Sequence, residues 1–374
     1  MSGPVNEPGA RPADADRADA DRAYAVVVPT LGRPSLGTCL RALADADGPP
    51  PVRVVLVDDR ARAAGAPLTA DVPPSLRSRT TVVPGGARGP AAARNTGWRA
   101  AGAVPWIVFL DDDVVPGRAW AAELARDLAA ATARTAAVTA RIDVPLPDDR
   151  RPTDWERNTA GLAEARWITA DMAYRRTALE AVGGFDERFR RAFREDADLA
   201  LRVIAAGWEV AEGARRTTHP VRPAGRWVSV RLQAGNADDV LMTRRHGRTW
   251  WRRADAPRGR LPGHLAVTGA AVAALSCAAL RRHRAATVCG ALWLTGTAEF
   301  ALARIRPGPR SREEVVTMAL TSVAIPPAAV WHWLRGQIAH RAAPPLEASA
   351  ASDSSQARGA SPAGRAAERE RVGS

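Results

Sequence analysis

Three consecutive carboxylates follow an apolar segment of the chain. Residues 106–110 read Trp-Ile-Val-Phe-Leu, and Asp111, Asp112 and Asp113 come directly after them. Adjacent acidic side chains repel one another unless a cation or hydrogen-bond donors lie among them. Carboxylate oxygens suit Mg²⁺ and Mn²⁺, which commonly join a carboxylate to the phosphates of a substrate. The run therefore indicates either a metal site for a phosphate-bearing substrate or an acidic turn at the surface.

Two other polar groups follow apolar segments in the same way. Pro29-Thr30 comes after residues 24–28, and Asp58-Asp59 comes after residues 52–57. Ligands of parallel α/β sheets bind at the carboxyl ends of the strands. Because all three groups occupy such ends, the binding-site interpretation is favoured over the surface turn.

Apolar runs alternate with helical segments from residue 24 onwards, which predicts a parallel α/β sheet with buried strands. The expected strands are residues 24–28, 52–57, 81–83, 106–110, 136–144, 167–174 and 207–210. The expected helices are residues 36–43, 89–101, 116–132, 177–182 and 195–206. Residues 145–165 are rich in proline and charge and are expected to be irregular.

Three long apolar segments, residues 265–280, 285–303 and 315–334, lie near the C-terminus and are separated by clusters of arginine. Their length and basic flanks fit membrane helices, short or tilted. A buried helical subdomain, or helices lying in the membrane interface, fits the same composition. Arginine flanks every segment, so the charge distribution alone does not orient them.

Composition limits the class of protein. The formal net charge is +13, and every basic residue other than histidine is arginine. Arginine suits phosphate or anionic lipid, but the abundance of Ala, Gly and Pro also fits a codon bias. No nucleic-acid recognition motif is visible, so a nucleic-acid partner is not expected. Three scattered cysteines and a polar N-terminus predict a cytoplasmic catalytic part.

Several short motifs follow one another in a fixed order. They are Pro29-Thr30, Asp58-Asp59, residues 89–97 (Gly-Pro-Ala-Ala-Ala-Arg-Asn-Thr-Gly), residues 111–113, Gly183-Gly184-Phe185-Asp186-Glu187 and Glu195-Asp196-Ala197-Asp198-Leu199. The series resembles the family 2 glycosyltransferases over roughly residues 24–220. The resemblance implies a GT-A fold, which is a Rossmann-like mixed sheet that binds a nucleotide-diphosphate sugar.

The resemblance also implies roles on the donor side of the site. Asp111 and Asp113 correspond to a D-x-D element that holds Mg²⁺ or Mn²⁺ on the diphosphate, with Asp113 a direct ligand and Asp111 on the ribose or on metal-bound water. His219 completes the metal shell. The residues expected to contact the donor are Pro29, Thr30, Asp58, Arg94, Asn95, Asp111 and Asp112. For Arg94, bracing of the aspartates is an equal alternative.

On the acceptor side, Asp196 corresponds to the base that takes the proton of the attacking hydroxyl, with Glu195 as the alternate. Acids in a first helical turn also favour the helix dipole, which is the competing interpretation. Gly183 and Gly184 leave room where the acceptor enters. Asp171 stands where the family often has a small or amide residue, so acceptor contacts in this loop depart from the pattern.

The prediction is an inverting glycosyltransferase at the cell membrane, acting on a lipid-linked or cell-envelope glycan. The expected parts are a disordered segment (1–22), a GT-A domain (23–255), membrane-associated helices (256–340) and a disordered tail (341–374). A nucleotidyltransferase is one alternative, although its Gly-rich loop with a lysine is missing near the first strand. A catalytically silent membrane scaffold of the same fold is the other.

Overall fold

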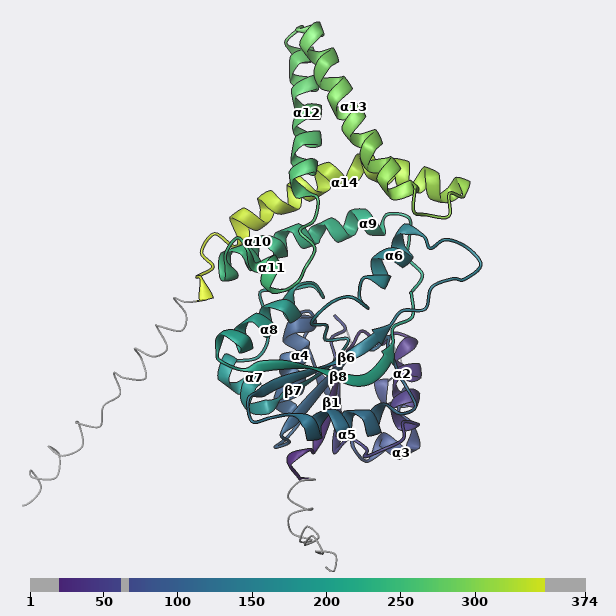
Figure 1. The fold of residues 1–374 in the computed structure, drawn as a ribbon, viewed down its shortest axis with the longest axis vertical. Helices are drawn as coiled ribbons and strands as arrows, with labels where there is room; N and C mark the ends of the chain where they lie inside the picture. The colour runs from purple at the N-terminus through teal and green to yellow at the C-terminus, as the bar shows by residue number, and fades with distance from the viewer. Residues whose placement is uncertain (1–19, 62–66, 347–374) are drawn as a thin grey trace, which may run out of the picture.

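The computed structural model describes residues 20–61 and 67–346 (Figure 1). Most of the expected N-terminal segment 1–22 and most of the tail 341–374 lie outside these residues. The remainder forms a domain built on a twisted sheet, above which two long helices project as a hairpin (Figure 1).

One sheet of eight strands runs through the described part of the domain, in the order β3-β2-β1-β4-β7-β6-β8-β5. The strands are β1 (Tyr24–Thr30), β2 (Arg53–Asp58), β3 (Thr80–Pro84), β4 (Trp106–Leu110), β5 (Val115–Pro116), β6 (Thr135–Asp143), β7 (Asp171–Arg175) and β8 (Glu209–Thr218). Strands β1 to β4 are parallel, as expected. β7 pairs antiparallel with both β4 and β6, so the sheet is mixed. The alternation of apolar runs and helices predicted only the parallel strands, because an apolar run does not reveal strand direction, whereas the mixed sheet implied by the resemblance is confirmed.

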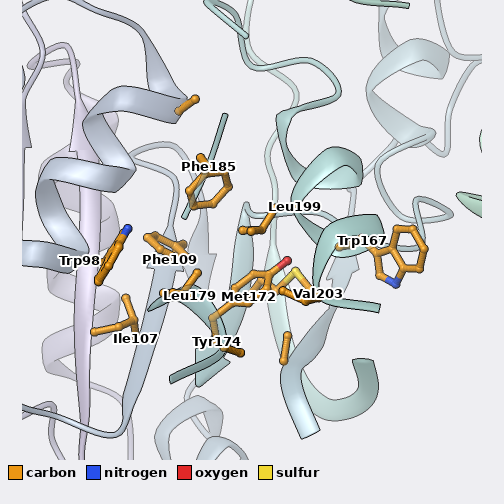
Figure 2. Packing of buried hydrophobic residues seen from close by; sticks show 14 of the residues in the cluster. Trp98, Ile107, Phe109, Trp167, Met172, Tyr174, Leu179, Phe185, Leu199 and Val203 are labelled. Atoms are coloured by element: carbon orange, nitrogen blue, oxygen red, sulfur yellow. The ribbon is translucent and has the colours of Figure 1, made fainter. Parts of the chain in front are cut away.

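Helices cover both faces of this sheet. In chain order they are α2 (Ser35–Ala44), η1 (Leu68–Asp71), α3 (Pro74–Arg77), α4 (Pro90–Ala100), α5 (Trp120–Ala130), α6 (Asp154–Ala160), α7 (Arg176–Val182) and α8 (Glu195–Ala205). Alternate strand residues point to opposite faces. In β1, Ala25 and Val27 pack in one core, whereas Val26 and Val28 pack in the other. The first core also holds Phe109, Tyr174 and Phe185, which stack edge to face (Figure 2).

Several segments differ from the sequence expectations. The strand expected at residues 207–210 is β8, which extends to Thr218. β7 begins only at Asp171, and the preceding residues 167–170 of the expected strand lie outside it. The segment 145–165 contains helix α6, which begins with a capping box: the Thr153 hydroxyl accepts from the Glu156 amide while the Glu156 side chain accepts from the Thr153 amide. Thr-x-x-Glu is a known start signal that the proline-rich surroundings obscured.

The C-terminal part forms a helical layer and a hairpin. Its elements are α9 (Val228–Arg231), η2 (Leu232–Ala234), α10 (Gly235–His246), α11 (Trp250–Arg253), α12 (Leu261–Ala279), α13 (His283–Ile305) and α14 (Arg312–Ala339). Within the described residues, α12, α13 and α14 are the helices long and apolar enough to cross a membrane. They coincide with the three predicted apolar segments. α12 and α13 extend away from the sheet domain, and α14 lies across their base above α9 and α10 (Figure 1).

Candidate active site

The three aspartates after β4 lie at the carboxyl edge of the sheet, beside the ends of β1 and β2. Asp112 is buried, and its carboxylate accepts hydrogen bonds from the Thr30 hydroxyl (2.6 Å) and from Arg33 Nη1 (2.9 Å). Strand register explains this contact, because Thr30 pairs with Asp58 on one side of β1 and β4 lies on the other. Asp112 and Thr30 therefore join the first strand to the acidic cluster, and their side chains are bonded to each other.

Asp113 faces basic groups from the segment after β8. Its Oδ2 lies 2.9 Å from Arg222 Nε, and its Oδ1 lies 3.8 Å from His219 Nε2. Burial, together with the charge of Asp111, raises the pKa of Asp113 above its ordinary value. A cation at this position would relieve both effects, and the guanidinium of Arg222 fills that role here.

Arg94 connects the two acidic motifs of the site. It lies in α4 and is almost fully buried, with Nη2 donating to Asp111 Oδ1 (2.8 Å) and Nη1 donating to Glu195 Oε1 (2.7 Å). The guanidinium fork can bond two carboxylates at once, which the point charge of a lysine cannot do with the same geometry. Residues separated by 84 positions along the chain are thereby brought to one buried arginine.

Glu195 and Asp196 begin helix α8, directly after Arg194, whose φ of 76° is left-handed. Burial and the neighbouring Asp196 raise the pKa of Glu195 to about 8, while Arg94 opposes that rise. Burial also raises the pKa of Asp196. Asp196 is the more open of the two acids and accepts a hydrogen bond from the amide of Ala197. The left-handed backbone of Arg194 is strained, and such a conformation persists only where the surrounding structure fixes it.

The surroundings of α8 supply that support through three acid–base pairs to α10. His246 Nε2 lies 2.7 Å from Asp198 Oδ1, Arg194 Nε lies 2.9 Å from Asp239 Oδ1, and Arg191 Nη2 lies 2.7 Å from Asp238 Oδ2. Asp198 is fully buried, and although burial opposes ionisation, Arg202 and His246 hold its pKa below the ordinary value. The start of α8 is therefore fixed against the helical layer.

Asn95 holds the Gly183–Glu187 loop against α4. Its Nδ2 donates to the Phe185 carbonyl (2.9 Å) and to Glu187 Oε1 (3.0 Å), and its Oδ1 accepts from the Phe185 amide (2.9 Å) and from Trp98 Nε1 (3.1 Å). The hydrogen-bonding capacity of this amide is thus used within the protein. Gly184 has a φ of 76°, and a Cβ there would lie 2.4 Å from Asn95 Oδ1, so the close approach requires glycine.

The remaining predicted residues lie at two different places. Asp58 ends β2 next to Thr30 and is paired with Arg60 Nη2 at 2.6 Å, a bond that lowers the pKa of Asp58. Asp171 is fully buried, where its carboxylate accepts from Trp120 Nε1, Arg215 Nε and the Thr217 hydroxyl. Asp171 therefore holds β7 to β8 and α5, and its carboxylate is enclosed by these partners.

Sequence reasoning missed Arg222 and Trp155. Trp155, in α6, donates from Nε1 to the Arg222 carbonyl (2.6 Å), and Arg222 in turn pairs with Asp113. The sequence held one clue to each residue. Arg222 follows the predicted site residue His219 by three positions, and Trp155 lies inside the Thr-x-x-Glu helix start. Neither type of residue stands out among the many arginines and tryptophans of this chain.

A divalent cation fits the residues at Asp113. One carboxylate and one imidazole converge there, and such ions commonly take their remaining ligands from water and substrate phosphates. Among the described residues, no three His, Cys, Asp or Glu side chains come together as a complete metal cluster. An ion held by Asp113 and His219 would therefore take its remaining ligands from water and substrate.

Comparison with known proteins relates part of the chain to a family. Residues 25–192 match the sequence model described as glycosyl transferase family 2. Two curated proteins named pre-mycofactocin glycosyltransferase, from two strains of Mycobacterium tuberculosis, are 34% identical over 131 residues, which is 32% of this chain and 27% of theirs. The chain thus spans about a quarter of the length of the curated relatives it matches.

A solved structure shares the architecture. A mannosyltransferase from Pyrobaculum calidifontis, in complex with GDP-mannose and Mn²⁺, aligns with a TM-score of 0.50 at 23% identity and covers 83% of this chain and 86% of its own. This likeness shows the GT-A fold.

Proposed function

Because residues 25–192 belong to glycosyl transferase family 2, we propose that this protein transfers a sugar from a nucleotide-diphosphate donor to an acceptor hydroxyl with inversion at the anomeric carbon. The observation that carries the proposal is the buried bridge Asp111–Arg94–Glu195, which joins a donor-type acidic cluster to a candidate base. Carboxylates in an acidic surface turn are solvated by water, so a fully buried arginine bonded both to one of them and to Glu195 is not expected there.

In this proposal Asp196 accepts the proton of the acceptor hydroxyl as its oxygen attacks the sugar. Its position at a helix start, fixed by Arg194 and α10, holds the carboxylate in one orientation. Glu195 is turned towards Arg94 and serves to position the helix start. Asp58 accepts hydrogen bonds from the base or ribose after its ion pair with Arg60 breaks. Pro29 and Thr30 shape the backbone beside the base.

Mg²⁺ or Mn²⁺ is the proposed cofactor, held by Asp113 and His219 with Asp111 nearby. When bound, the ion offsets the charge that develops on the departing nucleoside diphosphate. The solved mannosyltransferase holds Mn²⁺ together with GDP-mannose, which supports this assignment. The membrane helices favour a lipid-linked or cell-envelope acceptor, with the catalytic domain in the cytoplasm.

Purified protein in lipid should release a nucleoside diphosphate from one member of a panel of UDP-, GDP- and dTDP-sugars. Chelation with EDTA should abolish this release, and added Mn²⁺ or Mg²⁺ should restore it, because the diphosphate is a poor leaving group without a cation. Release of pyrophosphate instead would identify a nucleotidyltransferase. A protein that binds donor and releases neither product would be a silent scaffold.

Arg222 competes with a cation for Asp113, so replacing it should strengthen metal binding in the absence of donor. Arg222 is two-fifths exposed, and an exposed ion pair contributes only up to about 1 kcal/mol, so we expect Arg222→Gln to tighten Mn²⁺ binding by about two- to five-fold. Electron paramagnetic resonance of free Mn²⁺ measures this directly. Arg226→Gln, an exposed arginine in the same segment, is the control. Equal affinities in all three proteins would show that Arg222 does not occupy the cation position.

A further inference from the structure

The hairpin α12–α13 exposes apolar side chains on all sides. The exposed large apolar residues along it are Leu265, Val272, Leu275, Leu280, Val288, Leu292, Leu294 and Leu302. At 1.5 Å per residue, its 19- and 23-residue helices are about 28 and 34 Å long, close to the roughly 30 Å hydrocarbon core of a bilayer. The turn between them carries Arg281 and Arg282, and Arg284 lies in the first turn of α13. The hairpin thus has the length, surface and charged tip of a two-helix crossing.

Helix α14 has a different surface, although its hydropathy equals that of α12. One face is buried, through Met318, Thr321, Ser322, Ile325, Pro326, Ala329 and Gly336. The opposite face is exposed and carries Val316, Leu320, Val323, Pro327, Trp331, Leu334 and Ile338. At 3.6 residues per turn, these seven positions fall within an arc of about 80°. This exposed arc is named the α14 stripe below.

The buried face of α14 is fixed to the catalytic domain. Arg304, at the end of α13, is buried and donates to Thr321 and Ser322 of α14, to Asp154 of α6 and to Ser229 of α9. Towards the other end, a Cβ on Gly336 would lie 2.7 Å from the Ala237 Cα, so α14 and α10 cross in close contact. A helix held against a domain along this face lies beside it rather than continuing away from it (Figure 1).

We propose that only the hairpin α12–α13 crosses a lipid bilayer, and that α14 lies along the bilayer surface with its stripe in the boundary between headgroups and acyl chains. A helix with an apolar face towards lipid and its other face on protein is the expected form of an interfacial helix. Charge supports the choice of lipid over a second copy of the chain. The base of the hairpin carries exposed arginines that suit anionic headgroups, namely Arg258, Arg260, Arg310 and Arg312.

This placement has a consequence that rests on the proposed function. The contacts Arg304–Asp154, Trp155–Arg222 and Arg222–Asp113 form a short series from the base of the hairpin to the acidic cluster. The acidic cluster is thereby connected to the base of the hairpin, on the side of the domain that faces the bilayer, where the hydroxyl or phosphate headgroup of a membrane-embedded acceptor is presented.

Depth-dependent fluorescence quenching tests the placement without any use of transferase activity. In full-length protein carrying Cys277→Ala and Cys289→Ala, the remaining native Cys39 is buried. One accessible cysteine is then introduced by Val316→Cys, Val323→Cys or Leu334→Cys in α14, or by Val272→Cys or Leu292→Cys in the hairpin. An environment-sensitive label is attached, and the protein is placed in vesicles of phosphatidylcholine and phosphatidylglycerol. Spin-labelled lipids then quench at the headgroup or at mid-chain.

We expect all three α14 labels to be quenched mainly by the headgroup spin label and to a similar extent, whereas both hairpin labels are quenched several-fold more by the mid-chain label. A crossing α14 would give deep quenching at position 323 and shallow quenching at 316 and 334, which overturns the proposal. α14 labels that lipid spin labels do not quench, but that report proximity to a second labelled chain, would assign the stripe to self-association and overturn it as well.

The crossing of the hairpin has its own readout. With Arg282→Cys at the tip and Arg258→Cys at the base, a membrane-impermeant thiol reagent added outside sealed vesicles should label only one of the two positions in any oriented population. Labelling of both from the same side would describe a hairpin that enters and leaves the same leaflet. If the protein gives this labelling pattern but transfers no sugar, the proposed function is rejected while the membrane placement is supported.

Discussion

Replacing Asp196 by asparagine is expected to lower kcat by about 10²- to 10⁴-fold, the range that a positioned general base contributes. Asparagine keeps the size and the hydrogen bond from Ala197 but cannot accept the proton of the acceptor hydroxyl. Donor affinity should be unchanged, since Asp196 lies at the acceptor side. Asp45→Asn, an exposed carboxylate just after α2, is the matched control and should retain the activity of the unmodified protein.

The pH profile gives a second measurement of the same residue. The base acts in its ionised form, and its pKa is raised by burial. The transfer rate of the unmodified protein should therefore rise with pH through a value above the ordinary range of aspartic acid and then level off. The residual activity of Asp196→Asn should lack that rise. If Asp196→Asn keeps full kcat while Glu195→Gln loses it, the base is Glu195 instead.

Replacing Arg94 by methionine is expected to destabilise the fold by about 3–5 kcal/mol, the cost of removing one partner from a buried ion pair. The change leaves Glu195 buried beside Asp196 with no cation, and Asp111 loses the same donor. Arg99→Met, on the same helix, is the control. Arg99 is half exposed, and its pair with Glu187 is weak because Arg99 Nη1 lies as far as 3.9 Å from Glu187 Oε1. That variant should shift stability by less than about 1 kcal/mol. Thermal unfolding in detergent measures both.

The instability of Arg94→Met should depend on pH in a definite direction. The pKa of Glu195 is raised already, to about 8, and loss of Arg94 removes a group that lowers it. A carboxyl whose pKa is higher in the folded than in the unfolded state favours folding when protonated, and this contribution is lost as pH rises. The variant should therefore approach the unmodified protein at acidic pH and fall furthest below it at alkaline pH. A pH-independent difference would show that Glu195 is not the affected group.

Much of the site's placement was predictable because strand ends are readable from the sequence. Apolar runs ending in Thr30, Asp58 and Asp111 predict that these residues share one edge of the sheet, and the register of β1 with β2 places Thr30 opposite Asp58. The common placement of Asp58 and Asp111 followed from this alone, whereas Glu195 and Asp196, at the start of a helix, were proposed as site residues from the family resemblance. The mixed direction of the sheet did not follow from the apolar runs, because a strand buried on both faces has the same sequence pattern in either direction. It was predicted through the family resemblance.

The partners of individual side chains were not predictable, because they depend on contacts between residues far apart in the chain. Asp112 and Asp113 are neighbours, yet one bonds Thr30 and the other pairs with Arg222, 109 residues later. Asp171 resembles any other acid in the sequence, and only its position between Trp120 and Arg215 identifies it as structural. In a chain with so many arginines, no local pattern distinguishes Arg94 and Arg222 from the rest.

A water-soluble form of the protein must keep two contacts of α10. These are its acid–base pairs with the start of α8 and its crossing with α14. Cutting the chain before α12 removes the projecting hairpin, but it also uncovers the surface of α10 on which Gly336 rests and so loosens the support of Asp198 and Arg194. Excising residues 261–300 and joining the remaining ends with a flexible linker keeps that surface covered and retains Arg304, which holds α14 to α6 and α9. Polar replacements along the α14 stripe would then complete a soluble catalytic unit suited to crystallisation.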